Sequence, residues 1–264
     1  MHVDIPGSSA IAEFYDGLAS DYHLIYADRW EQSLRHQGGA LDALIRSSLP
    51  EARDVLDCAC GIGTQAIGLA LLGYRVTGTD ISERSLQRAR DTAAQLGTPL
   101  TVLPADFRDL RGVPGEFDVV TACDNAIAHL LDQADVDLAL KQMYRKLRPG
   151  GLLAISVRDY DRALKDRPAT APPIDIPGPP RRVVVRLHEW DTADSPLHTV
   201  RFLILTQQST GWTLTEHATR LRAITAAQLG SAATRAGFEQ IRWLDAAQAR
   251  FHQPIMTGRR GDQL

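Results

Sequence analysis

The sequence of 264 residues predicts an α/β fold whose central sheet is mostly parallel. Between residues 54 and 157, short apolar runs alternate with amphipathic helical patterns, which is typical of βαβ units. Three of the expected strands end in aspartate, at Asp57, Asp80 and Asp106. A turn with two glycines follows the first strand and precedes a helical pattern. Because ligands of open α/β sheets bind outside the carboxyl ends of the strands, we expect the three carboxylates to line one crevice.

Local signals define the elements of this sheet. Gly73 closes the first helix, and Ser82 is the expected N-cap of the second, whose apolar residues recur along one face. The third helix stops at the sequence RPGG. The expected strands occupy residues 54–60, 75–80, 100–106, 117–123 and 152–157, and the expected helices occupy residues 64–73, 83–97 and 134–147.

The two flanking regions have different patterns. Residues 1–50 carry helical patterns, among them 11–26 and 38–50. Residues 167–180 hold six prolines and predict an extended loop or lid. Three β-branched runs separated by polar turns then predict an antiparallel meander. Those runs occupy residues 181–190, 198–208 and 212–224, and they are followed by an expected helix at 225–237, a strand at 238–244 and a last strand within 251–260.

Composition excludes several classes of protein. The net charge of -3 and the pI near 6.2 give no basic surface for nucleic acid. No apolar run approaches the roughly 20 residues of a membrane-spanning helix, and the N-terminus lacks the pattern of a secretion signal. Cys58, Cys60 and Cys123 form no disulfide framework, which favours a cytoplasmic protein with reduced thiols. Because no second cysteine pair completes a zinc site, we expect packing roles for them and no metal.

The glycine turn is compatible with two kinds of ligand. Its spacing Gly61-x-Gly63-x-x-Ala66 fits the dinucleotide fingerprint. However, the carboxylates of Asp57 and Asp106 would repel a pyrophosphate at short range. They suit a ligand with a cationic centre, such as S-adenosylmethionine. In that case Asp80 accepts hydrogen bonds from the ribose hydroxyls and Asp106 from the adenine amino group, while Phe107 packs on the adenine ring.

The ordered motifs resemble those of class I S-adenosylmethionine-dependent methyltransferases. VLDCACGIGT, VTGTD, ADFRDL, FDVVTACDNAIAHL and LRPGGLLAISVRDYD occur in that family's order, and the resemblance covers about residues 10–260. It implies a Rossmann-like seven-stranded, mostly parallel sheet, with the tail strand inserted antiparallel. It also implies a single methyltransferase domain over residues 1–264, with a helical lid at 1–50 and an inserted antiparallel cap at 160–224. Within the class, NAIAHL, LALKQM and VRDYD resemble the glycine and sarcosine N-methyltransferase group.

The resemblance also assigns roles to residues. In that group, the residues that correspond to Asn125 and Arg158 contact an amino acid substrate, the arginine through the substrate carboxylate. One departure is Leu221, which stands near a position where the family often has tyrosine. The expected cofactor-binding residues are Tyr22, Tyr26, Trp30 and Arg35 of the lid, together with Asp57, Ala59, Gly61, Gly63, Asp80, Ile81, Asp106, Phe107 and Cys123.

Three of these residues have plainer alternatives. Asp80 could simply be an acid at a helix N-terminus, and Arg158 could form a surface ion pair. His129 could act as a general base in catalysis, although a role in capping a helix or in the cofactor shell is also compatible with its position.

The function expected from these residues is direct displacement of a methyl group onto a small-molecule acceptor. The most favoured reaction is N-methylation of an amine that bears a carboxylate, because an amine needs only to lose a proton on binding. One alternative is an O- or C-methyltransferase of a secondary-metabolite pathway, with His129 or His217 as base. Another is a noncatalytic nucleotide-binding protein. The sequence leaves both a monomer and a homodimer open.

Overall fold

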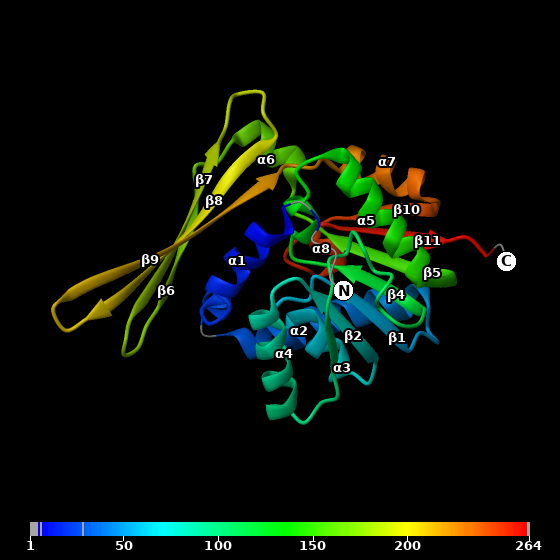
Figure 1. The fold of residues 1–264 in the computed structure, drawn as a ribbon, viewed down its shortest axis with the longest axis horizontal. Helices are drawn as coiled ribbons and strands as arrows, with labels where there is room; N and C mark the ends of the chain where they lie inside the picture. The colour runs from blue at the N-terminus through cyan, green and yellow to red at the C-terminus, as the bar shows by residue number, and fades with distance from the viewer. Residues whose placement is uncertain (1–4, 6, 28, 263–264) are drawn as a thin grey trace.

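A computed structural model gives the fold and describes residues 5, 7–27 and 29–262 (Figure 1). The main sheet contains seven strands: β1 Asp54–Cys58, β2 Arg75–Asp80, β3 Thr101–Pro104, β4 Phe117–Ala122, β5 Leu147–Ser156, β10 Phe238–Leu244 and β11 Ile255–Arg260. Their order is β10-β11-β5-β4-β1-β2-β3. Only β11 runs against its neighbours, since it pairs antiparallel with both β5 and β10. The predicted seven-stranded, mostly parallel sheet with an antiparallel tail strand is therefore confirmed.

Helices cover both faces of this sheet. On one face lie α2 Trp30–Ser48, α3 Thr64–Ala70 and α4 Glu83–Gln95, and on the other lie α5 Gln133–Lys146 and α7 Ala226–Ala236. Successive side chains of a strand point to opposite faces of the sheet, so each face has its own core. Val55 packs in the core beneath α2, α3 and α4, and Leu56 packs in the core beneath α5 and α7. Cys58 and Cys60 are buried in these two cores, in agreement with the packing role expected of them.

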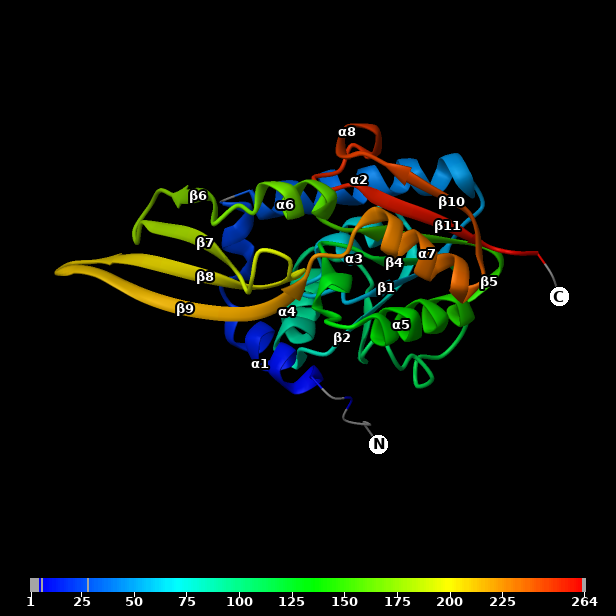
Figure 2. The ribbon, with the colours of Figure 1, turned by 90° about the horizontal axis from the view of Figure 1, so that it is seen from above.

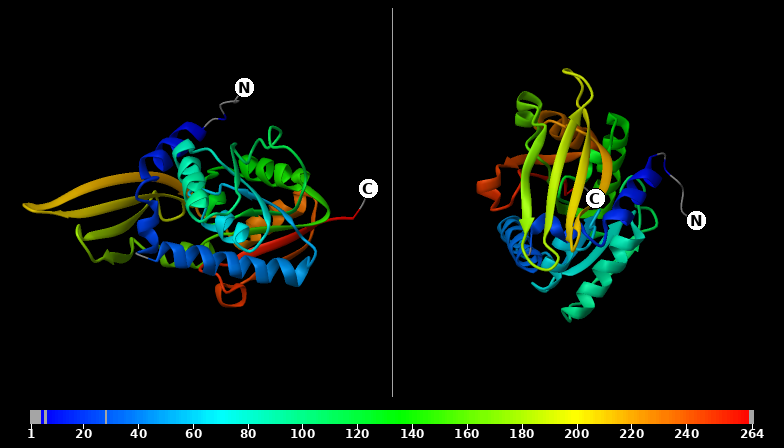
Figure 3. Two further views of the ribbon diagram at one scale, coloured as in Figure 1. Left: turned by 90° about the horizontal axis from the view of Figure 1, so that it is seen from below. Right: turned by 90° about the vertical axis from the view of Figure 1, so that its left-hand side faces the viewer.

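A second, antiparallel sheet is inserted between the short helix α6 Tyr160–Asp166 and α7. It contains β6 Thr170–Ile176, β7 Arg182–Trp190, β8 Leu197–Gln208 and β9 Gly211–Arg222, paired in that order. Figure 2 shows this sheet projecting from the main body, and Figure 3 shows its four strands side by side.

One expectation for this region was wrong. The proline-rich segment 167–180 is not all loop, because its middle forms the edge strand β6. Proline lacks an amide hydrogen and is tolerated at a sheet edge or bulge. In agreement with this, the pairing register shifts between Ala171 and Ile174, where Pro172 and Pro173 lie.

The N-terminal region is also broken up more than its helical pattern predicted. Helix α1 Ser8–Leu18 ends early, the 3-10 helix η1 Tyr22–Tyr26 follows, and α2 then begins. The break lets both Leu18 and Leu24 join one apolar cluster with Val184 and Ile204 of the antiparallel sheet. Helix α1 contacts both α4 and β9, so it bridges the two sheets (Figure 1). None of the helices in the described part of the chain is long and apolar enough to cross a membrane.

Candidate active site

The turn after β1 has the conformation that its glycines predict. Ala59, Gly61 and Gly63 all have positive φ angles, of 59°, 54° and 90°. Apart from the residues on either side of it in the chain, no heavy atom lies within 4 Å of the position that a Cβ of Gly61 would occupy, so the turn is open there. A Cβ at Gly63 would instead lie 2.7 Å from Ile67 Cδ1, because Gly63 is the N-cap of α3 and packs against it. Gly61 therefore leaves the turn open to a ligand, whereas Gly63 allows the turn to pack closely against α3.

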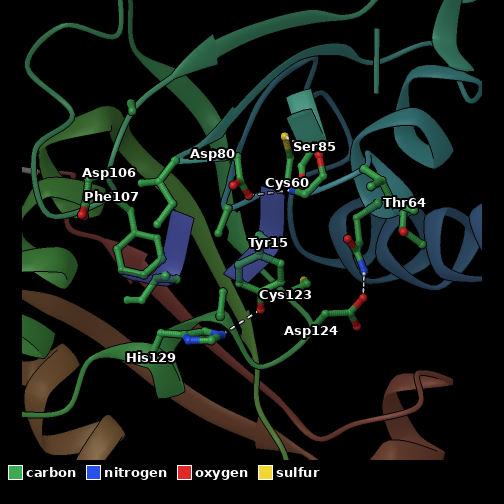
Figure 4. A pocket seen from close by; sticks show the side chains of 18 of the residues that line it. Tyr15, Cys60, Thr64, Asp80, Ser85, Asp106, Phe107, Cys123, Asp124 and His129 are labelled. Atoms are coloured by element: carbon green, nitrogen blue, oxygen red, sulfur yellow. Dashed lines mark hydrogen bonds between the residues drawn. The ribbon is translucent and has the colours of Figure 1, made fainter. Parts of the chain in front are cut away.

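A cavity, here the first cavity, lies between this turn, the carboxyl ends of the neighbouring strands and the N-terminal helices (Figure 4). Many of the residues expected to bind the cofactor meet there. Those that line it are Tyr22, Ala59, Gly61, Asp80, Ile81, Asp106, Phe107 and Cys123.

Asp80 is held in a fixed orientation at the end of β2. One carboxylate oxygen accepts a hydrogen bond from the Gly61 amide at 2.8 Å, and the other accepts one from the Ser82 amide at 2.9 Å. Asp80 is only 7% exposed, and burial raises its pKa to about 6. Since each carboxylate oxygen can accept more than one hydrogen bond, the side chain retains capacity for two ligand hydroxyls.

Asp106 has a partner that sequence reasoning missed. Its carboxylate pairs with Arg108 at 2.7 Å and also accepts a hydrogen bond from the Ser8 hydroxyl of α1. Burial by itself would raise the pKa of Asp106, but Arg108 and Ser8 lower it below its usual value. An adenine amino group would therefore share an acceptor that is already charged and oriented. The signal was present in the motif ADFRDL, because Arg108 lies two residues after Asp106.

Several expected cofactor residues lie outside the first cavity. Asp57 is buried below the turn, where it accepts a hydrogen bond from Thr121 Oγ1 at 2.8 Å, and burial raises its pKa to about 7. Trp30 does not line the cavity, but its Nε1 donates a hydrogen bond at 3.3 Å to Oγ1 of Thr64, which does. Arg35 is exposed on α2 and lines neither cavity, so its expected contact with the cofactor gains no support.

A second cavity of about 380 Å³ adjoins the first. It lies between the N-terminal helices, the end of β4 and the inner face of the antiparallel sheet. The predicted acceptor residues Asn125 and Arg158 both line it, as do Tyr26 and Leu221. Asn125 is fixed there, because its Oδ1 accepts from the Arg158 amide at 3.1 Å and its Nδ2 donates to the Tyr160 hydroxyl at 2.9 Å.

Asp124 connects the two cavities and was also missed. Its carboxylate accepts hydrogen bonds from the Tyr26 hydroxyl at 2.7 Å and from Gln65 Nε2 at 2.8 Å. His252 Nε2 lies 2.6 Å from its other oxygen. Asp124 follows the end of β4, so the argument that singled out the aspartates at the ends of the first three strands would have found it.

His129 lies where the two cavities meet, and it lines both. Its Nε2 and the Tyr15 hydroxyl share a hydrogen bond of 2.7 Å, drawn in Figure 4. His129 is 9% exposed, and burial lowers its pKa to about 4. The imidazole is therefore neutral near pH 7, with one ring nitrogen that accepts a hydrogen bond and one that donates. Tyr15, on α1, was not among the expected site residues, although it lies within the predicted lid.

The first cavity fits S-adenosylmethionine in its chemistry. It offers an open glycine turn, the fixed acceptor Asp80 and the aromatic ring of Phe107. It also places the carboxylates of Asp80, Asp106 and Asp124 around one space, which suits a ligand with a cationic centre better than a pyrophosphate.

Comparisons with known proteins agree with this fit. Residues 55–151 match the family model of a methyltransferase domain. The chain is 31% identical to the cypemycin N-terminal methyltransferase of a Streptomyces species over 211 residues, which are 78% of this chain and 81% of that relative. It is 34% identical to the glycine/sarcosine N-methyltransferase of Parasynechococcus marenigrum over 155 residues, or 57% of this chain and 55% of that relative. The chain thus spans about half the length of the first curated relatives it matches.

The fold has solved counterparts. The sugar N-methyltransferase KedS8 of Streptoalloteichus superimposes with a TM-score of 0.73 at 23% identity, over 91% of this chain and 92% of that one. Together with the matched relatives, this shows that the chain belongs to the family of S-adenosylmethionine-dependent methyltransferases. S-adenosylmethionine is the cofactor of that family, and the fold is its Rossmann-like α/β fold.

Proposed function

We propose that this chain transfers a methyl group from S-adenosylmethionine to the nitrogen of a small amine that carries a carboxylate. The observation that carries the proposal is the junction of two chemically different cavities at Tyr15 and His129. The first cavity has acceptors for a nucleoside and a cationic centre. The second has an arginine suited to an anionic group.

In the first cavity, Asp80 would hold the ribose, while Asp106 and Phe107 would hold the adenine. When bound, S-adenosylmethionine supplies a methyl group activated by its sulfonium. The chain itself needs to align donor and acceptor, exclude water and keep the nucleophile neutral. Helix α1 contributes to the exclusion of water, since its Ile11 and Tyr15 line the first cavity.

In the second cavity, Arg158 would bind the acceptor carboxylate through its planar guanidinium, and Asn125 would fix the Arg158 backbone. The amine would then face the Tyr15–His129 pair. Because burial lowers the pKa of His129 to about 4, the pair would take no proton from an ammonium group. It would instead hold, through a hydrogen bond, an amine that has already lost its proton to solvent, and direct the lone pair of that amine toward the methyl group. This is the role that we assign to His129.

The names of the relatives support nitrogen as the acceptor atom. The two relatives described above are an N-terminal methyltransferase and a glycine/sarcosine N-methyltransferase. An O- or C-methyltransferase would need a stronger base than a histidine whose pKa burial has lowered to about 4.

We further propose that residues 1–50 act as a lid on a single domain and that residues 160–224 form its cap. The hydrogen bonds between α1 and the main body support this. Asp16 accepts from the Ser82 hydroxyl at 2.6 Å and from the Arg84 amide at 3.2 Å, and Ser8 reaches Asp106. Helix α1 also supplies Ile11 and Tyr15 to the lining of the first cavity, so these contacts would have to open for the cofactor to enter and leave on this side.

A second candidate acceptor is an amino sugar. The volume of the second cavity, about 380 Å³, is within the range of small-molecule sites and larger than an amino acid of glycine's size requires. The solved structure of KedS8 described above is that of a sugar N-methyltransferase, although at 23% identity it supports the fold alone.

Two measurements test the proposed function. Thermal shift should show stabilisation by S-adenosylhomocysteine and not by NAD. Mass spectrometry with isotope-labelled S-adenosylmethionine should then detect methyl transfer to members of a panel of amino acids, amino sugars and hydroxy acids. Stabilisation by NAD alone would contradict the proposed methyl transfer, and transfer only to hydroxy acids would favour the O-methyl alternative.

A further inference from the structure

A second arginine shares the second cavity with Arg158. Arg186 lies in the middle of β7, opposite Ala171 of β6 and Phe202 of β8, and it lines the cavity. His188 lies two residues further along β7, on the same face of the strand. Arg158 Nη1 lies 3.2 Å and 3.4 Å from the two ring nitrogens of His188, so Arg158 lies against this face of β7, and both arginines line the same cavity.

Neither of these two cations has a carboxylate within ion-pair distance in the part of the chain that the structure describes, and the buried Nε of Arg186 has no hydrogen-bond partner there. Burial and then the nearby charge of Arg158 lower the pKa of Arg186. Asp124 is the one carboxylate among the described residues that line the cavity, and it already accepts from Tyr26 and Gln65.

An arginine on the opposite face of the same sheet gives a comparison, because its charge is balanced by neighbouring carboxylates. Arg201 of β8 pairs with Glu189 at 2.8 Å and with Glu216 at 2.5 Å. Arg201 is partly exposed to solvent and still has two carboxylate partners. Arg186 has a fully buried Nε, and no carboxylate in the described part of the chain pairs with it. Because an uncompensated charge in a partly buried site is costly, the pair of cavity arginines points to an anion supplied by a ligand.

We propose that the acceptor amine carries two negative charges at the end held by Arg158 and Arg186. Two chemical sources fit, an amino dicarboxylate and an amine that bears a phosphate. The inference rests on the proposed function, because it names the acceptor class of the same site. A single carboxylate would satisfy one guanidinium and leave the other charge uncompensated, whereas a dianion offers each arginine its own pair of oxygens.

The experiment measures binding and does not depend on turnover. Calorimetry on the protein saturated with S-adenosylhomocysteine compares two matched pairs of ligands, aspartate with glycine and phosphoethanolamine with its O-methyl ester, which carries a single negative charge. In each pair the ligands share the amine and differ in anionic charge. We expect at least one dianionic ligand to bind 10-fold or more tightly than its partner, and the pair that shows this identifies the source as carboxylate or phosphate.

Variants then show which arginine causes the preference for the dianionic ligand. In Arg186→Gln, the preference for the second charge should fall below about 3-fold, while glycine affinity changes less than about 3-fold. Arg186→Lys should keep part of the preference, and Arg201→Gln on the outer face should keep all of it. Unchanged affinity for S-adenosylhomocysteine shows that each variant is folded.

Two outcomes overturn the inference. One is a wild-type protein with no preference in either pair. The other is an Arg186→Gln variant that weakens glycine and the dianionic ligand equally, since the two arginines would then share a single anionic group. Methyl transfer to any amine in the mass-spectrometric panel would keep the proposed function in either case, so the two failures are distinguishable.

Discussion

The two cavities are lined by different kinds of residues, mostly from different parts of the chain. The first is formed mainly by backbone turns and carboxylates at the ends of successive parallel strands, with residues of α1 and η1 closing one side. The second draws side chains from the N-terminal helices, the end of β4, the antiparallel sheet and the segment before β11, and its charged groups are mainly cations. The contrast indicates that the main sheet determines the donor side, whereas the inserted sheet determines which acceptor fits.

The largest effect that tests this contrast between the donor and acceptor cavities is expected at Asp80. If the first cavity depends on this acceptor, Asp80→Ala should weaken binding of S-adenosylhomocysteine by about 1.5–3 kcal/mol, or about 10- to 150-fold, because a charge-assisted hydrogen bond is lost. Isothermal titration calorimetry gives the affinity directly. Arg35→Ala, in the exposed lid residue that lines neither cavity, is the control and should change the affinity less than 2-fold. An unchanged affinity in Asp80→Ala would contradict the ribose assignment.

Two adjacent glycines test how closely α2 packs against α3, the helix whose Thr64 and Gln65 line the first cavity. A Cβ on Gly38 would lie 2.5 Å from the backbone carbon of Gly68 in α3, whereas no atom lies within 4 Å of a Cβ on Gly39. Gly38→Ala should therefore lower the free energy of unfolding by about 1–3 kcal/mol through overpacking. Gly39→Ala should raise it by about 0.5–1 kcal/mol through helix propensity. Urea denaturation of both variants measures the difference, and equal effects would show that the helices separate freely.

The same contrast explains what could be predicted from the sequence. The strands and helices between residues 54 and 157, and the aspartates at strand ends, follow from local patterns, and the structure brings Asp80 and Asp106 together as expected. Asp57 lies just below the cavity, because β1 points its side chain toward Thr121 of the adjacent strand. Sequence spacing placed Asp57 near the turn and could not determine which side of it the carboxylate faces.

The second cavity was predictable only in part. Asn125 and Arg158 were found because the resemblance assigned them. Arg186 and Tyr15 were not, because their roles depend on which face of β7 and which face of α1 turn inward. Strand alternation places Arg182, Val184, Arg186 and His188 on one face, but a polar residue on such a face gives no local sign that it lines a cavity. That information comes from packing across distant segments.

Arg158 tests the acceptor side alone. Arg158→Lys keeps the charge and loses the planar fork, so the Michaelis constant for an anionic amine should rise about 10-fold. If the contact is equally strong in the ground and transition states, kcat should change less than the Michaelis constant. Affinity for S-adenosylhomocysteine should stay within 2-fold, because Arg158 lines only the second cavity. Steady-state kinetics with the best amine of the panel measures the effect, and a kinetically silent variant would remove Arg158 from the site.

The smallest expected effect is a difference in how the two regions respond to pH. Burial raises the pKa of Asp57, below the first cavity, from 3.8 to about 7. Its contribution to stability is therefore fully present below pH 3.8 and is lost as the pH rises through about 7. Burial, together with Arg158, lowers the pKa of His198, in the antiparallel sheet, from 6.5 to about 4. Its contribution is present above pH 6.5 and is lost as the pH falls through about 4.

Substitutions at these two residues should change the slope, or tilt, of the free energy of unfolding against pH in opposite directions. Relative to the wild type, Asp57→Asn should gain stability as the pH rises from 4 to 7.5, because an amide needs no proton to remain buried and neutral. His198→Gln should gain relative stability as the pH falls from 6.5 to 4.5. Each tilt should amount to about 1 kcal/mol or more, given about 1.4 kcal/mol per pKa unit. Urea denaturation at intervals of one pH unit measures both curves. Tilts of the same sign would mean that burial acts alike on the two regions, and the electrostatic contrast between them would then fail.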